Sequence, residues 1–149
     1  MKLSTKGRYG LRALIDLALY SENETVSIQS IARRQNISDS YLEQLMRKLR
    51  SAGLIVSVRG AQGGYKLARP ANEISVGDVL RALEGSLEAV TCGEDNSCQG
   101  ADLCVTKFVW ERINSSIRDT VDSIKLSQLV EESRLMREKG QIQVQKCDN

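Results

Sequence analysis

The spacing of apolar and polar positions in the first third of the chain predicts three short helices. Apolar residues recur every three to four positions over residues 5–21, 27–36 and 38–52, as on one face of a helix. Ser27 and Ser38 stand directly before the second and third of these runs, where a serine hydroxyl caps a helix, and Gly53 ends the third. The second and third helices are joined by a short turn and therefore predict a helix-turn-helix.

Two short β-like runs follow at once, over residues 54–58 and 65–68. The turn between them, residues 59–64, holds three glycines and suits a tight hairpin. A helix-turn-helix followed directly by a hairpin is the winged-helix arrangement. Pro70, the only proline of the chain, closes this module.

The second half of the chain predicts helices separated by one loop. Ser75 caps a helix that ends at Gly85, and apolar content then falls sharply between residues 90 and 104. A helix of about five turns follows, because apolar residues recur every four positions. They are Val105, Val109, Ile113, Ile117 and Val121, with Phe108, Trp110 and Ile124 beside them. A shorter helix follows Ser127, and we expect a mainly α fold with a small β-wing.

Charge divides the chain into two unlike parts. Residues 1–70 hold twelve Lys and Arg against five Asp and Glu, whereas residues 71–149 hold nine against fourteen. A basic first half suits a surface that binds nucleic-acid phosphates. No run of about 18 apolar residues is present, and the first residues lack the apolar core of a signal peptide, so we expect a cytoplasmic protein without a membrane span.

The absence of histidine limits the possible chemistry. Serine–histidine and cysteine–histidine catalysis are impossible within one such chain. No nucleotide-binding glycine motif is present either, and we therefore expect a protein that is not an enzyme. The modest size of the core that 149 residues can bury favours further burial by oligomerisation.

Polar side chains of the third helix and the wing are candidates for reading DNA. Gln44 can bond adenine through two hydrogen bonds, Glu43 can accept one from cytosine, and Arg47 can reach phosphate or guanine. The full candidate set is Ser38, Ser40, Tyr41, Glu43, Gln44 and Arg47 on the helix, and Arg59 and Gln62 in the wing. The alternative is that these are ordinary solvated residues of an amphipathic helix and a turn.

Three of the four cysteines form a regular constellation in the loop. Cys92, Cys98 and Cys104 are each separated by five residues, and Cys147 stands apart in the tail. Structural zinc sites use tighter pairs, whereas soft thiolates in a loop of small residues suit an iron–sulfur cluster. The spacing matches none of the common ferredoxin patterns. Three free thiols remain the alternative.

These stretches together resemble the IscR-type regulators, a family of winged-helix transcription repressors with a three-cysteine cluster loop. Relatives that sense other signals lack this loop. The resemblance covers residues 1 to about 135. The matching stretches are residues 1–9, 40–45, 57–60, 63–65 and 98–100.

The resemblance implies a homodimeric repressor that carries a [2Fe–2S] cluster on Cys92, Cys98 and Cys104 and controls genes for cluster assembly. The cluster-assembly machinery would donate the cluster, and an operator in double-stranded DNA would be contacted by Ser38, Tyr41, Glu43, Gln44 and Arg59. The long helix would pair with its twin. The expected organisation is a DNA-binding domain (1–70), a connecting helix and cluster loop (71–104), a dimerisation helix with a short helix (105–137) and a disordered tail (138–149).

One position departs from the family pattern. The family's fourth ligand is a histidine three residues after the last cysteine, and Lys107 stands there in this chain. An ammonium group cannot ligate iron, so Lys107 is expected to be a neighbour that offsets thiolate charge. The open candidates for the fourth ligand are Glu94, Asp95, Asp102, a residue of a partner subunit, and water. The alternative function is a winged-helix regulator that uses the cysteines as a thiol or zinc switch.

Overall fold

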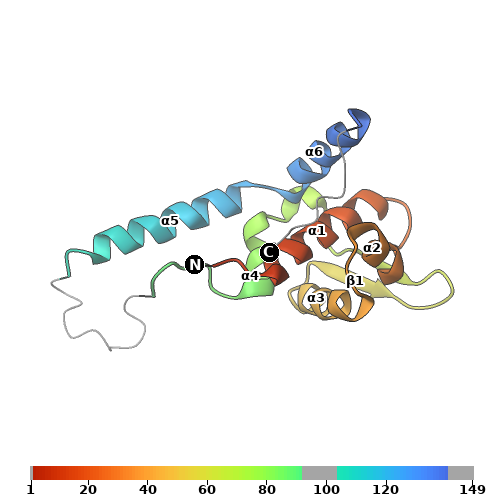
Figure 1. The fold of residues 1–149 in the computed structure, drawn as a ribbon, viewed down its shortest axis with the longest axis horizontal. Helices are drawn as coiled ribbons and strands as arrows, with labels where there is room; N and C mark the ends of the chain where they lie inside the picture. Colours follow the sequence, from red (N-terminus) through yellow and green to blue (C-terminus); the bar gives the residue numbers. More distant parts are fainter. Residues whose placement is uncertain (1, 92–103, 141–149) are drawn as a thin grey trace.

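The computed structural model describes residues 2–91 and 104–140, and it has the expected mainly α architecture with a two-stranded wing (Figure 1). The elements in chain order are α1 (Thr5–Tyr20), α2 (Ile28–Gln35), α3 (Asp39–Ser51), β1 (Ile55–Val58), β2 (Gly64–Leu67), the 3-10 helix η1 (Ala71–Glu73), α4 (Val76–Glu84), α5 (Lys107–Ser123) and α6 (Leu126–Glu138). Residues 92–103, which include most of the expected cysteine loop, and residues 141–149 lie outside the described part.

The helix boundaries follow from the caps that the sequence predicts. The Ser27 hydroxyl accepts a hydrogen bond from the backbone N–H of Ser30 at 3.2 Å, and the Ser38 hydroxyl accepts one from Tyr41 at 3.3 Å. Asn36 ends α2 in the left-handed conformation, with φ of 54°. Ser27 thus starts α2, while Asn36 and Ser38 bound the short turn between α2 and α3, which confirms the predicted helix-turn-helix.

The core lies between α1, α2, α3 and α4. Its largest fully buried side chains are Leu14, Leu17, Ile31, Leu42, Leu45, Met46, Leu49, Leu54, Ile55, Ile74, Leu83 and Leu126. Each helix contributes residues three or four positions apart, which is the periodicity that predicted the helices. The helix-turn-helix is therefore held by apolar packing against α1 and α4.

The wing is an antiparallel hairpin in which Ile55 pairs with Leu67 and Val58 with Gly64. The backbone of Val26, just before α2, exchanges two hydrogen bonds of 2.8 and 2.9 Å with Tyr65 and so joins the hairpin to the helix-turn-helix. Gly60 has φ of 111° in the turn, a conformation that favours glycine.

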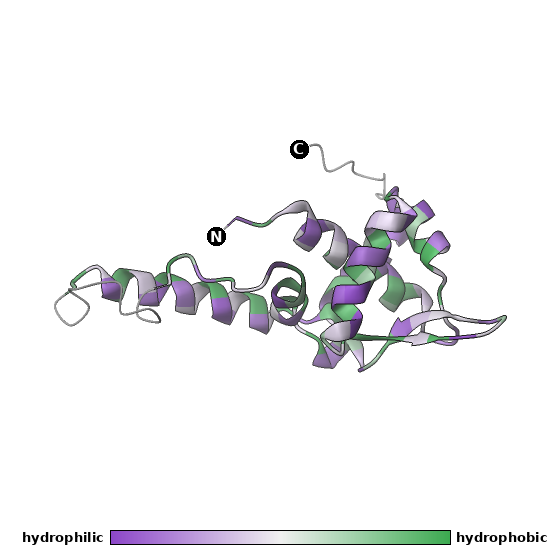
Figure 2. Cartoon of the chain, turned by 90° about the horizontal axis from the view of Figure 1, so that it is seen from below, coloured by the Kyte–Doolittle hydropathy of each residue, from purple (hydrophilic) through white to green (hydrophobic). Residues whose placement is uncertain are grey.

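Helix α5 projects from the body on the side opposite to the wing (Figures 1 and 2). Its end is tied to the start of α4, because the N–H of Val76 donates to Ile124 at 2.8 Å and the N–H of Leu126 donates to Ile74 at 2.8 Å. Helix α6 then packs on the body, where Leu126 and Val130 join the main core. Two side chains of α6 thus belong to the same core as α1, α2 and α3.

A close helix contact joins α1 to the last turn of α4. Gly7 and Gly10 are both buried on the face of α1 that meets α4. A Cβ at Gly7 would lie 2.7 Å from Oε1 of Glu84, and one at Gly10 would overlap the buried side chain of Leu83. The two helices can approach this closely only because α1 has no side chains there.

We expect Gly10→Ala to destabilise the protein by about 1–3 kcal/mol, because the added methyl overpacks the core against Leu83. In a solvent-exposed helix, Gly→Ala stabilises the protein, so a loss of stability in Gly10→Ala would indicate overpacking and not a change in helix propensity. Chemical denaturation of the purified protein measures it. Arg8→Ala introduces the same residue at an exposed position of α1 and should change stability by less than about 0.5 kcal/mol. Equal stability of the two variants would contradict the predicted overlap.

Candidate nucleic-acid interface and cysteine site

Helix α3 presents four of the candidate DNA-reading side chains together. Ser40, Glu43, Gln44 and Arg47 are all exposed, at the three- and four-residue spacing that places them on one face. The opposite face carries Leu42, Leu45, Met46 and Leu49, which are buried. The apolar side therefore fixes the helix in the body while the polar side is available to a major groove.

Ser38 and Tyr41 lie at the start of α3, and both are engaged within the chain. Ser38 caps the helix, while Tyr41 is half-buried and meets the ring of Tyr9 edge-on, with centroids 6.2 Å apart. The Tyr41 hydroxyl donates to Oγ1 of Thr5 at 3.2 Å. Tyr41 thus fixes the start of α3 against the start of α1.

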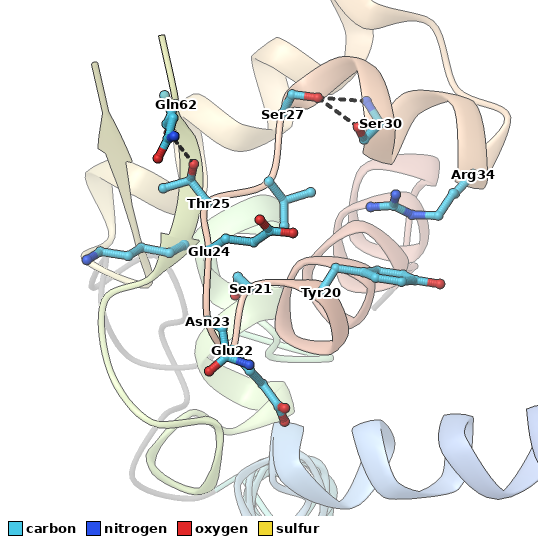
Figure 3. Close-up of a pocket in the computed structure, with 13 residues that line it drawn as sticks. Tyr20, Ser21, Glu22, Asn23, Glu24, Thr25, Ser27, Ser30, Arg34 and Gln62 are labelled. Carbon is cyan, nitrogen blue, oxygen red and sulfur yellow. Dashed lines mark hydrogen bonds between the residues drawn. The ribbon is translucent and has the colours of Figure 1, made fainter. Parts of the chain in front are cut away.

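The two wing candidates, Arg59 and Gln62, are both exposed on the turn of the hairpin. The Thr25 hydroxyl donates to the backbone carbonyl of Gln62 at 2.6 Å and ties the turn to the segment before α2 (Figure 3). A hollow of about 750 Å³ lies beside this contact, between the wing and the α1–α2 turn. Its lining is mainly polar, unlike the apolar pockets that hold most small ligands.

The basic residues of α1 divide into two kinds. Lys6 and Arg8 are exposed on α1, the helix whose Thr5 bonds Tyr41 at the start of α3. Arg12 instead bonds the side chain and the backbone carbonyl of Gln35, each at 3.2 Å, and lies over the ring of Tyr9. Arg12 therefore holds α2 against α1.

An ion pair with a buried acid, which sequence reasoning missed, also holds α2 against α1. Asp16 is 1% exposed, and both of its carboxylate oxygens accept hydrogen bonds from Arg34, at 2.6 to 3.1 Å. The bond to Asp16 raises the pKa of Arg34. Gln35 also donates to Asp16 at 2.9 Å. The signal was an acid between Ile15 and Leu17, inside the apolar stripe of the first helix.

Cys104 is the one predicted cysteine ligand that the described residues include, and it lies just before α5. Its sulfur is 3.1 Å from the hydroxyl of Thr106. This hydrogen bond, one from the backbone N–H of Lys107, and the Lys107 charge lower the pKa of the Cys104 thiol. Those donors stabilise a thiolate, the form that binds metal. Cys92, Cys98, Cys147, Glu94, Asp95 and Asp102 lie outside the described residues.

Lys107, at the position of the family's fourth ligand, is the first residue of α5. Its Nζ lies 3.8 Å from Oε1 of Glu111, one turn further along the helix. Within residues 2–91 and 104–140, no group of three or more metal-binding side chains converges.

Asn114 on α5 holds the chain that leads toward Cys92, and sequence reasoning missed this contact as well. Its Oδ1 accepts from the N–H of Ala89 at 2.8 Å, and its Nδ2 donates to the carbonyl of Val90 at 2.8 Å. The same helix begins just after Cys104. Both ends of the segment that carries the cysteines are therefore fixed to α5.

The helix-turn-helix, the wing and the exposed polar face of α3 together define a winged-helix DNA-binding protein. A family model supports this class, because residues 3–132 match Rrf2, described as an iron-dependent transcriptional regulator. The chain belongs to the Rrf2 family.

Individual relatives cover most of the chain. It is 43% identical over 136 residues to the HTH-type transcriptional regulator IscR of Vibrio campbellii. This match covers 91% of this chain and 81% of the relative. The solved structure of T. potens IscR is 45% identical, with a TM-score of 0.72 over 96% of this chain and 93% of that one.

A second similar solved structure is that of a different regulator, CymR. CymR of B. subtilis, the global cysteine regulator, is 41% identical, with a TM-score of 0.74 over 89% of this chain and 98% of that one. The chain is thus a DNA-binding transcription regulator and not an enzyme. Among the described helices, none is long and apolar enough to cross a membrane.

We expect Thr106→Val to raise the pKa of the Cys104 thiol, because the variant lacks the hydroxyl that bonds the thiolate. In metal-free protein at neutral pH, alkylation of Cys104 by iodoacetamide should then be slower. Mass spectrometry of the separated peptides reports this rate for Cys104 alone. Thr106→Ser keeps the hydroxyl and should react at the wild-type rate. A valine variant that reacts equally fast would refute the assignment.

Proposed function

We propose that this regulator is a homodimeric repressor whose affinity for DNA is set by a [2Fe–2S] cluster on Cys92, Cys98 and Cys104. The observation that carries the proposal is the thiolate-stabilising environment of Cys104 at the end of a segment with three evenly spaced cysteines. IscR-type relatives supply the cluster type, and relatives that sense other signals lack the three-cysteine loop. The genes controlled would be those for cluster assembly, whose machinery would donate the cluster.

The DNA contacts would come from α3 and the wing. Gln44, Glu43 and Arg47 would read base edges or phosphates from the exposed face of α3, with Ser40 beside them. Ser38 and Tyr41 would contact the backbone at the start of that helix. Arg59 and Gln62 would approach the minor groove from the glycine-rich turn. The positive charge of residues 1–70 would supply attraction that does not depend on sequence.

The spacing of the cysteines fits a cluster better than zinc, because structural zinc sites use tighter pairs. In the described part of the site, the Cys104 thiol has a lowered pKa beside Lys107 and backbone N–H groups, which would offset the negative charge of a bound cluster. When bound, the cluster would supply a group whose formation and loss follow the supply of iron and sulfide. Lys107 would remain a neighbour paired with Glu111, so the fourth ligand would be an acid of the loop, a partner residue or water.

The partner for dimerisation would be a second copy, paired along the first half of α5. Val105, Phe108, Val109 and Ile113 are 86%, 65%, 44% and 38% exposed. The second half of the same apolar stripe, Ile117 and Val121, packs instead on α4 within the chain. The uncovered half lies on the projecting arm (Figure 1), where a twin helix could reach it.

The visible absorption spectrum of protein purified without oxygen, with iron and sulfide assayed on the same sample, tests the proposed cofactor. We expect visible bands that bleach on reduction, with iron and sulfide in equal amounts. Cys104→Ser should lose most of this absorption, while Cys147→Ser, a matched change outside the constellation, should keep it. A wild-type protein that stays colourless after incubation with iron and sulfide would favour the thiol or zinc switch.

We expect Val109→Glu to raise the dimer dissociation constant by at least about 100-fold, because a two-fold interface would bury two like charges. Analytical ultracentrifugation over a range of concentrations measures it. Arg118→Glu introduces the same residue at an exposed polar position of α5 and should leave the dimer unchanged. A Val109→Glu protein that is as dimeric as this control would exclude α5 as the interface.

A further inference from the structure

We propose that Glu84 is a positioning residue for the DNA interface. It fixes the start of α1 to the last turn of α4, and through Thr5 and Tyr41 it also fixes the start of the recognition helix α3. Glu84 does not face DNA itself in this role. Its position is also where the chain leaves the winged module for the cysteine segment.

The contacts of Glu84 are concentrated on one oxygen. Oε1 accepts three hydrogen bonds, from the N–H of Ser4 at 2.9 Å, from the Ser4 hydroxyl at 2.6 Å and from the N–H of Gly7 at 2.8 Å. Partial burial would raise the pKa of Glu84, but these bonds and the charge of Lys6 outweigh it, and the pKa is lowered. A carboxylate therefore holds the first turn of α1, whose free N–H groups favour an anion.

A hydrogen bond connects the start of α1 to the start of α3. Thr5 follows Ser4 directly, and its Oγ1 accepts the hydrogen bond of Tyr41 at 3.2 Å. A second link is independent of α1, because Nζ of Lys48 on α3 donates to the carbonyl of Leu83 at 3.4 Å. The last turn of α4 is thus bonded directly to the last part of α3 and, through the first turn of α1, to the start of α3.

The same turn leads toward the cysteines. Gly85 ends α4 with φ of 82°, and Asn114 holds Ala89 and Val90 on α5. Only a few residues therefore separate Glu84 from a segment fixed to α5. If the cysteine segment binds a cluster, as proposed above, a shift in its path would reach α1 and α3 through this turn.

The DNA affinity of cluster-free protein tests the positioning role. The probe is a labelled duplex that the wild-type protein selects from a random-sequence pool, and binding is followed by fluorescence anisotropy. Loss of a negative charge on its own strengthens DNA binding, and Glu88→Ala, at an exposed glutamate four residues later, provides this baseline. Glu84→Ala is expected to act in the opposite direction and to weaken binding by roughly 2- to 30-fold. Binding as tight as that of Glu88→Ala would overturn the proposal.

Two further variants separate positioning from a general loss of structure. Glu84→Gln keeps an acceptor oxygen without the charge, so its affinity should lie between wild type and Glu84→Ala. Thr5→Val breaks the bond to Tyr41, and its effect should be less than additive with that of Glu84→Ala. Circular dichroism and denaturation check that each protein is folded. Fully additive effects would overturn the route through Thr5.

The ratio of affinities between cluster-loaded and cluster-free protein tests the connection to the cysteines. A wild-type ratio of one would refute cluster sensing. The positioning role of Glu84 would still be tested by the DNA affinity of cluster-free Glu84→Ala. A wild-type ratio that differs from one and is retained in Glu84→Ala would overturn the connection but leave cluster sensing intact. We expect the ratio to move toward one in Glu84→Ala and to stay at the wild-type value in Glu88→Ala.

Discussion

The close contact between α1 and the last turn of α4 governs how the rest of the winged module is arranged. Gly7 and Gly10 leave room for Glu84 and Leu83, so that polar bonds and apolar packing act at the same place. Helix α1 in turn supports α2 through the ion pair of the buried Asp16 with Arg34. Because interiors are densely packed, a change at this contact would, on the proposed positioning role, reach α3 through Thr5 and Tyr41.

Local signals in the sequence predicted the helices and the hairpin, but not the 3-10 helix η1 or the start of α6, which is at Leu126 and not after Ser127. Serine caps before apolar runs, Asn36 and Gly53 after them, and the glycines of the wing each act over a few residues, and the structure contains the corresponding helices and hairpin. The capping box of Ser75 and Asp78 is of the same kind. The exposed face of α3 was predictable for the same reason, since helical periodicity alone separates Gln44 from Leu45.

Contacts between residues far apart in the sequence were not predictable in this way. Glu84 and Ser4 are 80 positions apart, and Asn114 lies 24 positions from Val90. The residues around Glu84 and Asn114 in the sequence do not mark either one as special. An acid at the end of a helix and an asparagine within a helix each have many possible partners, so the sequence does not select one. Periodicity also failed to divide the apolar stripe of α5, since intrachain packing on α4 covers Ile117 and Val121 but not Val105 or Val109.

That division gives α5 three roles at three places along its length. Its first residues stabilise the Cys104 thiolate, its uncovered apolar side suits a twin helix, and its last turn is tied to α4 by the backbone of Ile124. A winged-helix dimer reads two half-sites at a fixed spacing, so in the proposed dimer the angle between α5 and the DNA-binding part of the chain would affect DNA affinity. The bonds of Asn114 to Ala89 and Val90 and of Ile124 to Val76 would both help to set this angle, and the first of them lies next to the cysteine segment.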